Sequence, residues 1–515
     1  MSKDFKQDRT AVCASRTVID SPYELPVERD FVLPDYYPDI FRILRCTVSP
    51  SVVSRSLNGG RLSFEVLAYI KVLYLSENDK RINCIEQKVT LSKSVETDAE
   101  CSDPTIRIDL CCDYVNCRVV NRRRLDVRGA VTAYVRVTCE DVRYAVTDAW
   151  GAGIQLKKQL MTYPARRINT AKRITVIEEL ELSSSKPSVG AVLRCGCVIN
   201  RGEQKMIAGK LITKGEAEIS MLYSCIDAAG EDSAETMRFS LPFSQIIDVE
   251  GIDESFTADI DITVAGCEIM PKGEDSTSLE CELVLNVLCS AVKYESTEVV
   301  TDAFSTEFEC TTQQGADRIE AAPIAVKREC RTEGTLTPAE GRPVSVYDCF
   351  AECSDISVIK DDEKNTFTLS GTVSFCAVGA GEDGQPFFTE SRSTLEEEIP
   401  IPEGAGEDPA LEAAADVTGC SYYLTDSASL EVKADVRIEG KVRSFVPCKV
   451  ISSIEPDEDK PRERDRSCAL KLCRCGENED IWDIAKRYSA SVSAILEENE
   501  LEEDSFSGGM LLIPL

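Results

Sequence analysis

The sequence predicts a mainly β protein with three tandem β-sandwich or barrel-like repeats and a small C-terminal domain of order βααβ. Three observations lead to this prediction. Residues 176–223 align without a gap on residues 27–74, a shift of 149 positions. Long segments alternate apolar and polar residues with a period of two, which indicates half-buried antiparallel strands. Helical periodicity is scarce outside the last 48 residues, which therefore form a separate domain.

The internal match keeps residues of very different types in one frame, which a chance alignment would not do. A period near 150 residues is the size of a domain and is too long for a solenoid repeat, so the match predicts tandem domains. A third and more divergent copy opens at Val344–Cys349. The aligned pairs include Pro187 with Pro38, Arg194 with Arg45, Cys195 with Cys46, and Tyr223 with Tyr74.

Each copy contains strands that the alternation marks clearly. We expect strands at 62–74 and 125–137 in the first copy, at 281–289 in the second, and at 367–378 and 430–438 in the third. On this pattern Leu283 and Val432 point to the interior of their domains.

The chain therefore divides into six parts. The segment 456–467 is charged and contains no apolar residue, which is typical of a linker. The predicted parts are an N-terminal arm at 1–26, repeats at 27–160, 174–306 and 341–455, a charged linker at 456–467, and the C-terminal domain at 468–515.

Charge is distributed unevenly along the 515 residues. The net charge of −32 divides into +6 for residues 1–173 and −38 for the remainder. An acidic bulk of this size argues against nucleic acid as a partner. It serves solubility, or it provides a surface for a basic partner or for head-to-tail self-association.

Catalytic and metal chemistry have little support in the sequence. The chain has no histidine, which excludes Ser-His-Asp and Cys-His catalysis and all His-ligated metal sites. The 24 cysteines include no Cys-x-x-Cys spacing and lie in apolar strand patterns, so we expect mostly reduced, structural thiols. We therefore expect a non-enzymatic protein with no cofactor and no metal. The cysteine pairs considered as metal or redox sites are Cys195 with Cys197, Cys111 with Cys112, and Cys473 with Cys475.

Two further features bear on location and on ligands. No apolar run is long enough to span a bilayer, and residues 1–10 are polar, unlike a signal peptide, so we expect a cytoplasmic protein. The run Arg122–Arg124 is either an anion site or, as we expect, a solvated hairpin tip.

The C-terminal domain resembles a LysM module. The resemblance is carried by Ile481–Tyr488, Asn499 and Gly509–Pro514, which occur in the order of that family. LysM families usually have Gly-Asp before the apolar pair, where this chain has Asn478 and Glu479, so binding to a peptidoglycan or chitin-type glycan is in question. The groove residues that the resemblance implies for a partner or a glycan are Glu477, Asn478, Glu479, Asp480, Ile481, Asn499, Leu501, Gly508, Gly509 and Met510.

The repeats resemble the SPOCS domain of spore-coat morphogenetic proteins. The motif is Leu33–Ile40, LPDYYPDI, followed by Arg42–Leu44. Together with the LysM-like tail, the resemblance implies a scaffold in the mother-cell cytosol at the forespore surface, whose LysM module binds a coat morphogenetic protein, a coat ATPase. The alternatives are a peptidoglycan-binding protein of the cell wall or spore cortex and, with the weakest support, an unrecognised enzyme.

Overall fold

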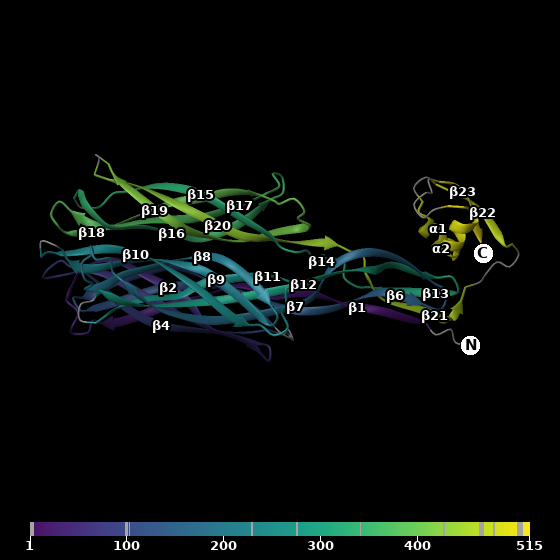
Figure 1. Ribbon diagram of the computed structural model, residues 1–515, viewed down its shortest axis with the longest axis horizontal. Coiled ribbons are helices and arrows are strands. Elements are labelled where there is room, and N and C mark those ends of the chain that lie inside the picture. The colour runs from purple at the N-terminus through teal and green to yellow at the C-terminus, as the bar shows by residue number, and fades with distance from the viewer. Residues whose placement is uncertain are drawn as a thin grey trace.

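The computed structural model confirms a mainly β protein. It describes residues 5–97, 101, 104–227, 230–273, 277–339, 341–425, 428–462, 468–476, 479–501 and 508–514. The described chain contains strands β1 to β23 and two short helices, α1 and α2. Three two-sheet units lie side by side, strands extend from them along the long axis, and a small module lies at the far end (Figure 1).

The first unit pairs two three-stranded antiparallel sheets. One sheet has the order β1-β6-β5 and the other β2-β3-β4. The strands are β1 (Lys6–Val32), β2 (Ile40–Asn58), β3 (Arg61–Ser76), β4 (Ile82–Glu96), β5 (Thr105–Asn121) and β6 (Arg124–Trp150).

The second unit follows the same pairing scheme, with sheets β11-β12-β7 and β10-β9-β8. Its longest strands, β7 and β12, continue beyond the unit, as β1 and β6 do in the first. The strands are β7 (Ile154–Glu181), β8 (Ala191–Ile207), β9 (Lys210–Ile226), β10 (Asp232–Asp248), β11 (Phe256–Lys272) and β12 (Ser278–Ser305).

The third unit has sheets β16-β17-β18 and β15-β20-β19, and the short strand β14 pairs with the end of β20. Strand β13 pairs with β21 outside the unit. The strands are β13 (Phe308–Gln314), β14 (Arg318–Glu320), β15 (Ile324–Leu336), β16 (Pro343–Asp361), β17 (Thr366–Gly381), β18 (Pro386–Pro400), β19 (Glu407–Leu424), β20 (Leu430–Pro447) and β21 (Ile451–Pro461).

Each unit has its own hydrophobic core between its two sheets. The central strands alternate buried and less buried residues, as the sequence pattern predicts, and Leu283 and Val432 are both buried. Tyr74 in the first core and Tyr223 in the second are fully buried, and their hydroxyls donate to the Pro38 and Pro187 carbonyls, at 3.2 Å and 3.1 Å. These bonds tie the loop that opens each unit to its central strand.

The loop with the LPDYYPDI motif is also clamped by one arginine. Arg123 donates to the Pro34 carbonyl oxygen at 2.8 Å and to the Asp39 carboxylate at 2.7 Å. Its neighbours pair with Glu77 and Asp30, so all three arginines of the run are engaged within the fold. Residues 122–123 form the turn between β5 and β6, the hairpin tip that we expected.

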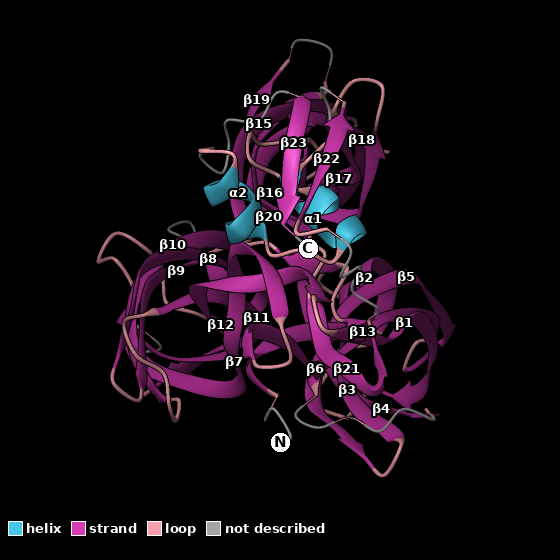
Figure 2. Cartoon of the chain, turned by 90° about the vertical axis from the view of Figure 1, so that its right-hand side faces the viewer, coloured by secondary structure: helices cyan, strands magenta, loops and turns pink. Residues whose placement is uncertain are grey.

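Three two-stranded ribbons extend from the units and pack into a stalk. The ribbons are formed by the outer parts of β1 with β6, of β7 with β12, and of β13 with β21. Each contributes buried apolar side chains to a shared interior, with Val146, Val300 and Ile451 in one cluster. Viewed along the long axis, the three units surround the line of this stalk (Figure 2).

Charged side chains join the units at the centre. Arg45 of the first unit pairs with Glu352 of the third at 2.7 Å. Arg194, at the equivalent position of the second unit, lies 3.3 Å from Asp348 and stacks on the Phe350 ring at 3.5 Å. The third unit thus supplies the carboxylates that neutralise the guanidinium groups of the other two.

Glu320 of β14 is a second junction between the units. Its carboxylate accepts from Ser15 of the first unit at 3.1 Å, from Arg167 of the second, and from Arg443 of the third at 3.1 Å. Burial opposes ionisation of Glu320, but Arg167 and Arg443 outweigh it and lower its pKa. One nearly buried carboxylate therefore contacts all three units.

Two segments differ from the sequence prediction. Residues 6–26, expected as an arm, belong to β1, because Val12 and Leu25 alternate with polar residues and face buried interiors. Residues 456–461, expected as linker, are the end of β21 paired with β13, because a ribbon needs backbone hydrogen bonds and not apolar side chains. Residues 463–467 lie outside the described part of the chain.

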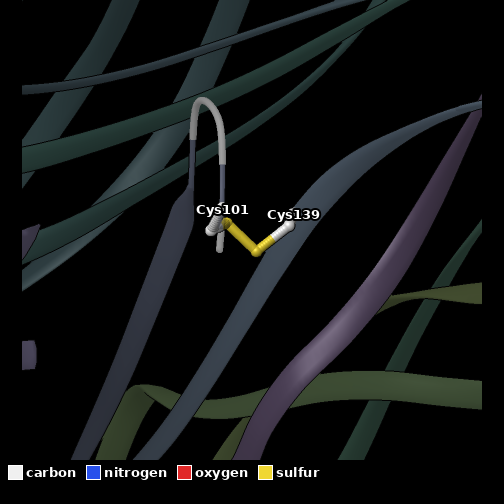
Figure 3. Close-up of a disulfide and its surroundings, with 2 residues drawn as sticks. All are labelled: Cys101 and Cys139. Atoms are coloured by element: carbon white, nitrogen blue, oxygen red, sulfur yellow. A yellow bond between two sulfur atoms is a disulfide. The ribbon is translucent and has the colours of Figure 1, made fainter. Parts of the chain in front are cut away.

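One disulfide was not foreseen. Cys101, in the connection between β4 and β5, is bonded to Cys139 of β6 (Figure 3). The other described cysteines are free thiols, in line with the expectation that most are reduced.

We predict that Glu320→Gln destabilises the assembly of the three units. The neutral amide leaves the nearly buried Arg167 without its counter-charge and removes one of the three carboxylates around Arg443, which costs about 3 kcal/mol. Urea unfolding at neutral pH measures the loss. Glu309→Gln, at an exposed pair with Lys460, is the control and should change stability little. Equal unfolding midpoints for the two variants would contradict this role.

Candidate functional site: the C-terminal module

The C-terminal module contains two strands and two helices in the order β22 (Leu470–Cys475), α1 (Ile481–Tyr488), α2 (Val492–Glu498) and β23 (Gly509–Pro514). Strands β22 and β23 pair antiparallel, with Leu472 opposite Leu512. The helices pack on one face of this pair and bury Ile484, Ala485 and Ile495. The module is thus a small layer of helices on a two-stranded sheet.

Local sequence explains how α1 begins and ends. Asp480 is the N-cap, and its side chain accepts from the Trp482 backbone N–H at 3.1 Å. Asp483 lies in the first turn and Lys486 and Arg487 in the last, where their charges suit the helix dipole. Ser489 ends the helix in the left-handed conformation, with φ of 53°.

The second helix is capped by another part of the chain. Ser491 occupies the N-cap position of α2, but its side chain makes no capping hydrogen bond. The Gln155 side chain of β7 instead accepts from the Val492 backbone N–H at 3.3 Å. The stalk thereby completes a helix of the module.

The main contact between module and stalk is aromatic. Phe304 of β12 is almost fully buried and packs edge-on against Trp482, with ring centroids 5.0 Å apart. The Trp482 indole N–H donates to the Asp302 carboxylate at 2.7 Å. Phe304 belongs to the same hydrophobic cluster as the core of the module, so the stalk tip completes that core.

Ion pairs surround this contact. Lys486 binds Asp302 at 2.7 Å, and Lys157 binds Asp480 at 2.5 Å. Arg462, after β21, donates to the Ser489 hydroxyl at 2.7 Å. Two ribbons therefore reach the module: the β7–β12 ribbon through Lys157 and Asp302, and the β13–β21 ribbon through Arg462, which follows β21.

These contacts perturb the acidic groups of the site. Burial opposes ionisation of Asp302, but hydrogen bonds from Lys486 and Trp482 outweigh it and lower its pKa. The hydrogen bond from Lys157 lowers the pKa of Asp480. Glu479 is half-buried, and its hydrogen bond from Arg487 lowers its pKa. All three carboxylates are held in the charged form.

The residues expected to line a groove have different surroundings. Asp480 faces the stalk through Lys157, and Ile481 is buried in the module core. Asn499 links α2 to β23. Its side-chain amide donates to the Ile495 and Leu512 carbonyls and accepts from the Leu512 N–H, each at 2.7 Å. Glu477 and Asn478 lie outside the described residues.

The remaining expected residues follow α2 or begin β23. Leu501 is half-buried and packs against the module core. Gly508 and Gly509 both have positive φ, at 90° and 135°, where glycine is favoured. Met510 is 57% exposed and is the most accessible apolar side chain among the expected groove residues.

Sequence reasoning missed the docking residues Gln155, Asp302 and Phe304. They lie some 180 to 340 positions from the module in the chain, and no local pattern links them to it. Asp302 and Phe304 lie inside the expected second repeat, near the end of β12, and the strand pattern alone does not show what they contact.

The described residues contain no group of three or more Cys, Asp or Glu side chains arranged to hold a metal ion. Neither α1 nor α2 is long and apolar enough to cross a membrane. The arrangement of charged and apolar groups at the stalk tip is suited to holding a module and to binding.

Comparison with known proteins adds one finding. Residues 188–272 match the family model described as SipL, SPOCS domain. The matched segment covers strands β8 to β11 of the second unit. This supports the SPOCS resemblance and indicates a sporulation-related protein associated with the spore coat. Neither the curated proteins nor the solved structures include a match to the chain.

We predict that Phe304→Ala releases the module from the stalk. Trp482 loses its edge-to-face partner and part of a shared core, a change worth about 3 kcal/mol. Tryptophan fluorescence should shift to the red as Trp482 becomes hydrated, over a constant contribution from Trp150, which is already 46% exposed. Tyr114→Ala, at a side chain 59% exposed in the first unit, is the control. An unchanged spectrum in Phe304→Ala would show that docking does not depend on this ring.

We predict that docking weakens in acid through Asp302. Its folded pKa lies below the unfolded value of about 3.9, so the stabilisation is complete above that value and is lost as pH falls through the folded pKa. The same fluorescence signal, followed from pH 7 to pH 2.5, measures this. Asp302→Asn should dock more weakly at pH 7 and show less of the acid transition. Identical transitions in both proteins would assign the effect to other carboxylates.

Proposed function

We propose that the protein is a non-enzymatic scaffold that anchors the spore coat or envelope during its assembly. The SPOCS match at residues 188–272 carries this proposal. The first and third units pair their strands in the same scheme as the matched unit, which supports treating all three as SPOCS-like repeats. A scaffold of three such units would bind at the forespore surface, on the mother-cell side.

The second part of the proposal concerns the C-terminal module, which we treat as LysM-like. In this proposal the module docks on a coat morphogenetic protein. The family resemblance implies that this partner is a coat ATPase. Residues 468–515 carry 4 basic and 10 acidic residues, and an acidic module favours a basic protein surface. Its place at the end of the stalk, away from the units, supports presentation to a partner (Figure 1).

Peptidoglycan is the alternative ligand of this module, and the βααβ order of its elements favours that reading. Uncharged regions of a glycan give little attraction to an acidic module. The groove edge at Asp480 is engaged with Lys157 of the stalk, which leaves less of the groove open to a long sugar chain. The protein partner is therefore the main proposal. Self-association between the basic first unit and the acidic remainder is a further possibility for assembly.

We predict that the full chain retains a coat morphogenetic protein from lysate of sporulating cells, whereas the chain ending at residue 467 does not. Affinity capture followed by mass spectrometry checks this, and sedimentation with purified peptidoglycan tests the alternative. Retention by peptidoglycan without any enriched coat protein would overturn the proposal.

Phe304→Ala in the full chain is the matched control. It keeps the module but loosens its docking, so capture that survives in this variant assigns binding to the module itself. Capture lost in Phe304→Ala but kept in Tyr114→Ala would instead require the docked arrangement of module and stalk.

A further inference from the structure

On one side of each two-sheet unit, the edge strand of one sheet packs against the edge strand of the other. These edge pairs are β2 with β5, β8 with β11, and β16 with β19. The two strands of each pair belong to different sheets, so no backbone ladder joins them. The side is held by side chains alone.

In every unit one cysteine from each edge strand meets the other across this side. The Sγ atoms of Cys195 and Cys267 lie 3.3 Å apart, and those of Cys349 and Cys420 lie 3.7 Å apart. Cys46 and Cys117 are hydrogen-bonded to each other at the same place in the first unit. The sequence separations are 71, 72 and 71 residues.

The register shows that the three pairs are equivalent. Cys46, Cys195 and Cys349 each lie one place after the residue of the central charged junction, Arg45, Arg194 or Asp348. Their partners lie opposite core residues of the long strand: Val127 for Cys117, Leu283 for Cys267, and Ala434 for Cys420. A residue needed only as a small hydrophobe would be replaced by Val or Ala in some units, yet both positions are Cys in all three.

The pairs also have the reactivity that thiol exchange requires. Five of the six cysteines are half-buried, and Cys349 is buried. Hydrogen bonding within each pair lowers the pKa of Cys117, Cys195 and Cys420 and raises that of the partner thiol. One member of each pair is thus the better thiolate, and the thiolate is the species that attacks a disulfide.

We propose that these three cysteine pairs are oxidisable dithiols, which form disulfides by exchange with a small-molecule disulfide and so close each sandwich covalently. One thiolate attacks the small disulfide and releases one small thiol. The second protein thiol loses its proton and displaces the other small thiol, forming the protein S–S bond. Two protein thiols are oxidised, and one small disulfide is reduced to two thiols.

The proposal goes beyond the scaffold function and does not depend on it. Oxidation would join two sheets that otherwise share only side-chain contacts, and it would do so in all three units at once. The Cys101–Cys139 bond differs, because it joins the connection between β4 and β5 to the β6 strand of the first unit (Figure 3). A reduced scaffold could thereby assemble first and be fixed later, when its surroundings become oxidising.

The test uses the full chain, purified reduced and then treated with oxidised glutathione. After free thiols are blocked and the protein is digested, mass spectrometry should find the linked pairs Cys46–Cys117, Cys195–Cys267 and Cys349–Cys420. The mass of each linked pair of peptides should be about 2 Da below the summed mass of the two reduced peptides. The urea midpoint should rise on oxidation and return on reduction.

Two variants complete the test. The triple variant Cys117→Ala, Cys267→Ala and Cys420→Ala should lose the oxidative rise in the midpoint, whereas Cys289→Ala should keep it. Cys289 is a fully buried thiol whose pKa is raised to about 11 by burial alone. Glutathione attached to single cysteines, different pairings, or linked pairs without a rise in the midpoint would overturn the proposal. If the triple variant does not fold, the pairings mapped in the wild-type chain decide.

Discussion

A two-stranded ribbon has no interior, and this constraint explains the architecture. Such a ribbon is marginally stable alone in water, because neither of its faces is covered. Here each unit extends one ribbon, and the three together enclose the apolar layers that contain Val146, Val300 and Ile451. The stalk therefore exists only when all three units are present and parallel. The junction at Glu320 lies where the ribbons leave the units and holds them in that arrangement.

Sequence reasoning was most successful where a pattern is local. Period-two alternation located the central strands and placed Leu283 and Val432 in the cores, because one buried face fixes the side-chain alternation of a strand. It failed for residues 6–26 and 456–461, because ribbons in a shared stalk are polar over much of their length. Their strand character depends on pairing partners that are distant in the chain, β6 for β1 and β13 for β21, which no local window contains.

In the candidate site, too, some features have local sequence signals and others depend on distant residues. The α1 helix and its Asp480 cap followed from local signals, as did the end strands of the module. The docking of Trp482 on Phe304 and Asp302 and the capping of α2 by Gln155 join residues far apart in the chain. The sequence shows an aromatic residue at Trp482 but not the surface that it meets. In the whole protein this side chain is part of the attachment to the stalk.

The exchange of Arg45 and Arg194 for Asp348 in the third unit has a consequence for stoichiometry. A ring of three first units, or of three second units, would place three guanidinium groups together at its centre without a counter-ion. A ring of third units would gather only carboxylates there. A neutral centre requires units with an arginine and units with carboxylates at this place. One chain carries two units with the arginine and one with the carboxylates. Folding within a single chain satisfies this rule, whereas a ring of three like units from three chains breaks it, so the charge pattern disfavours such rings.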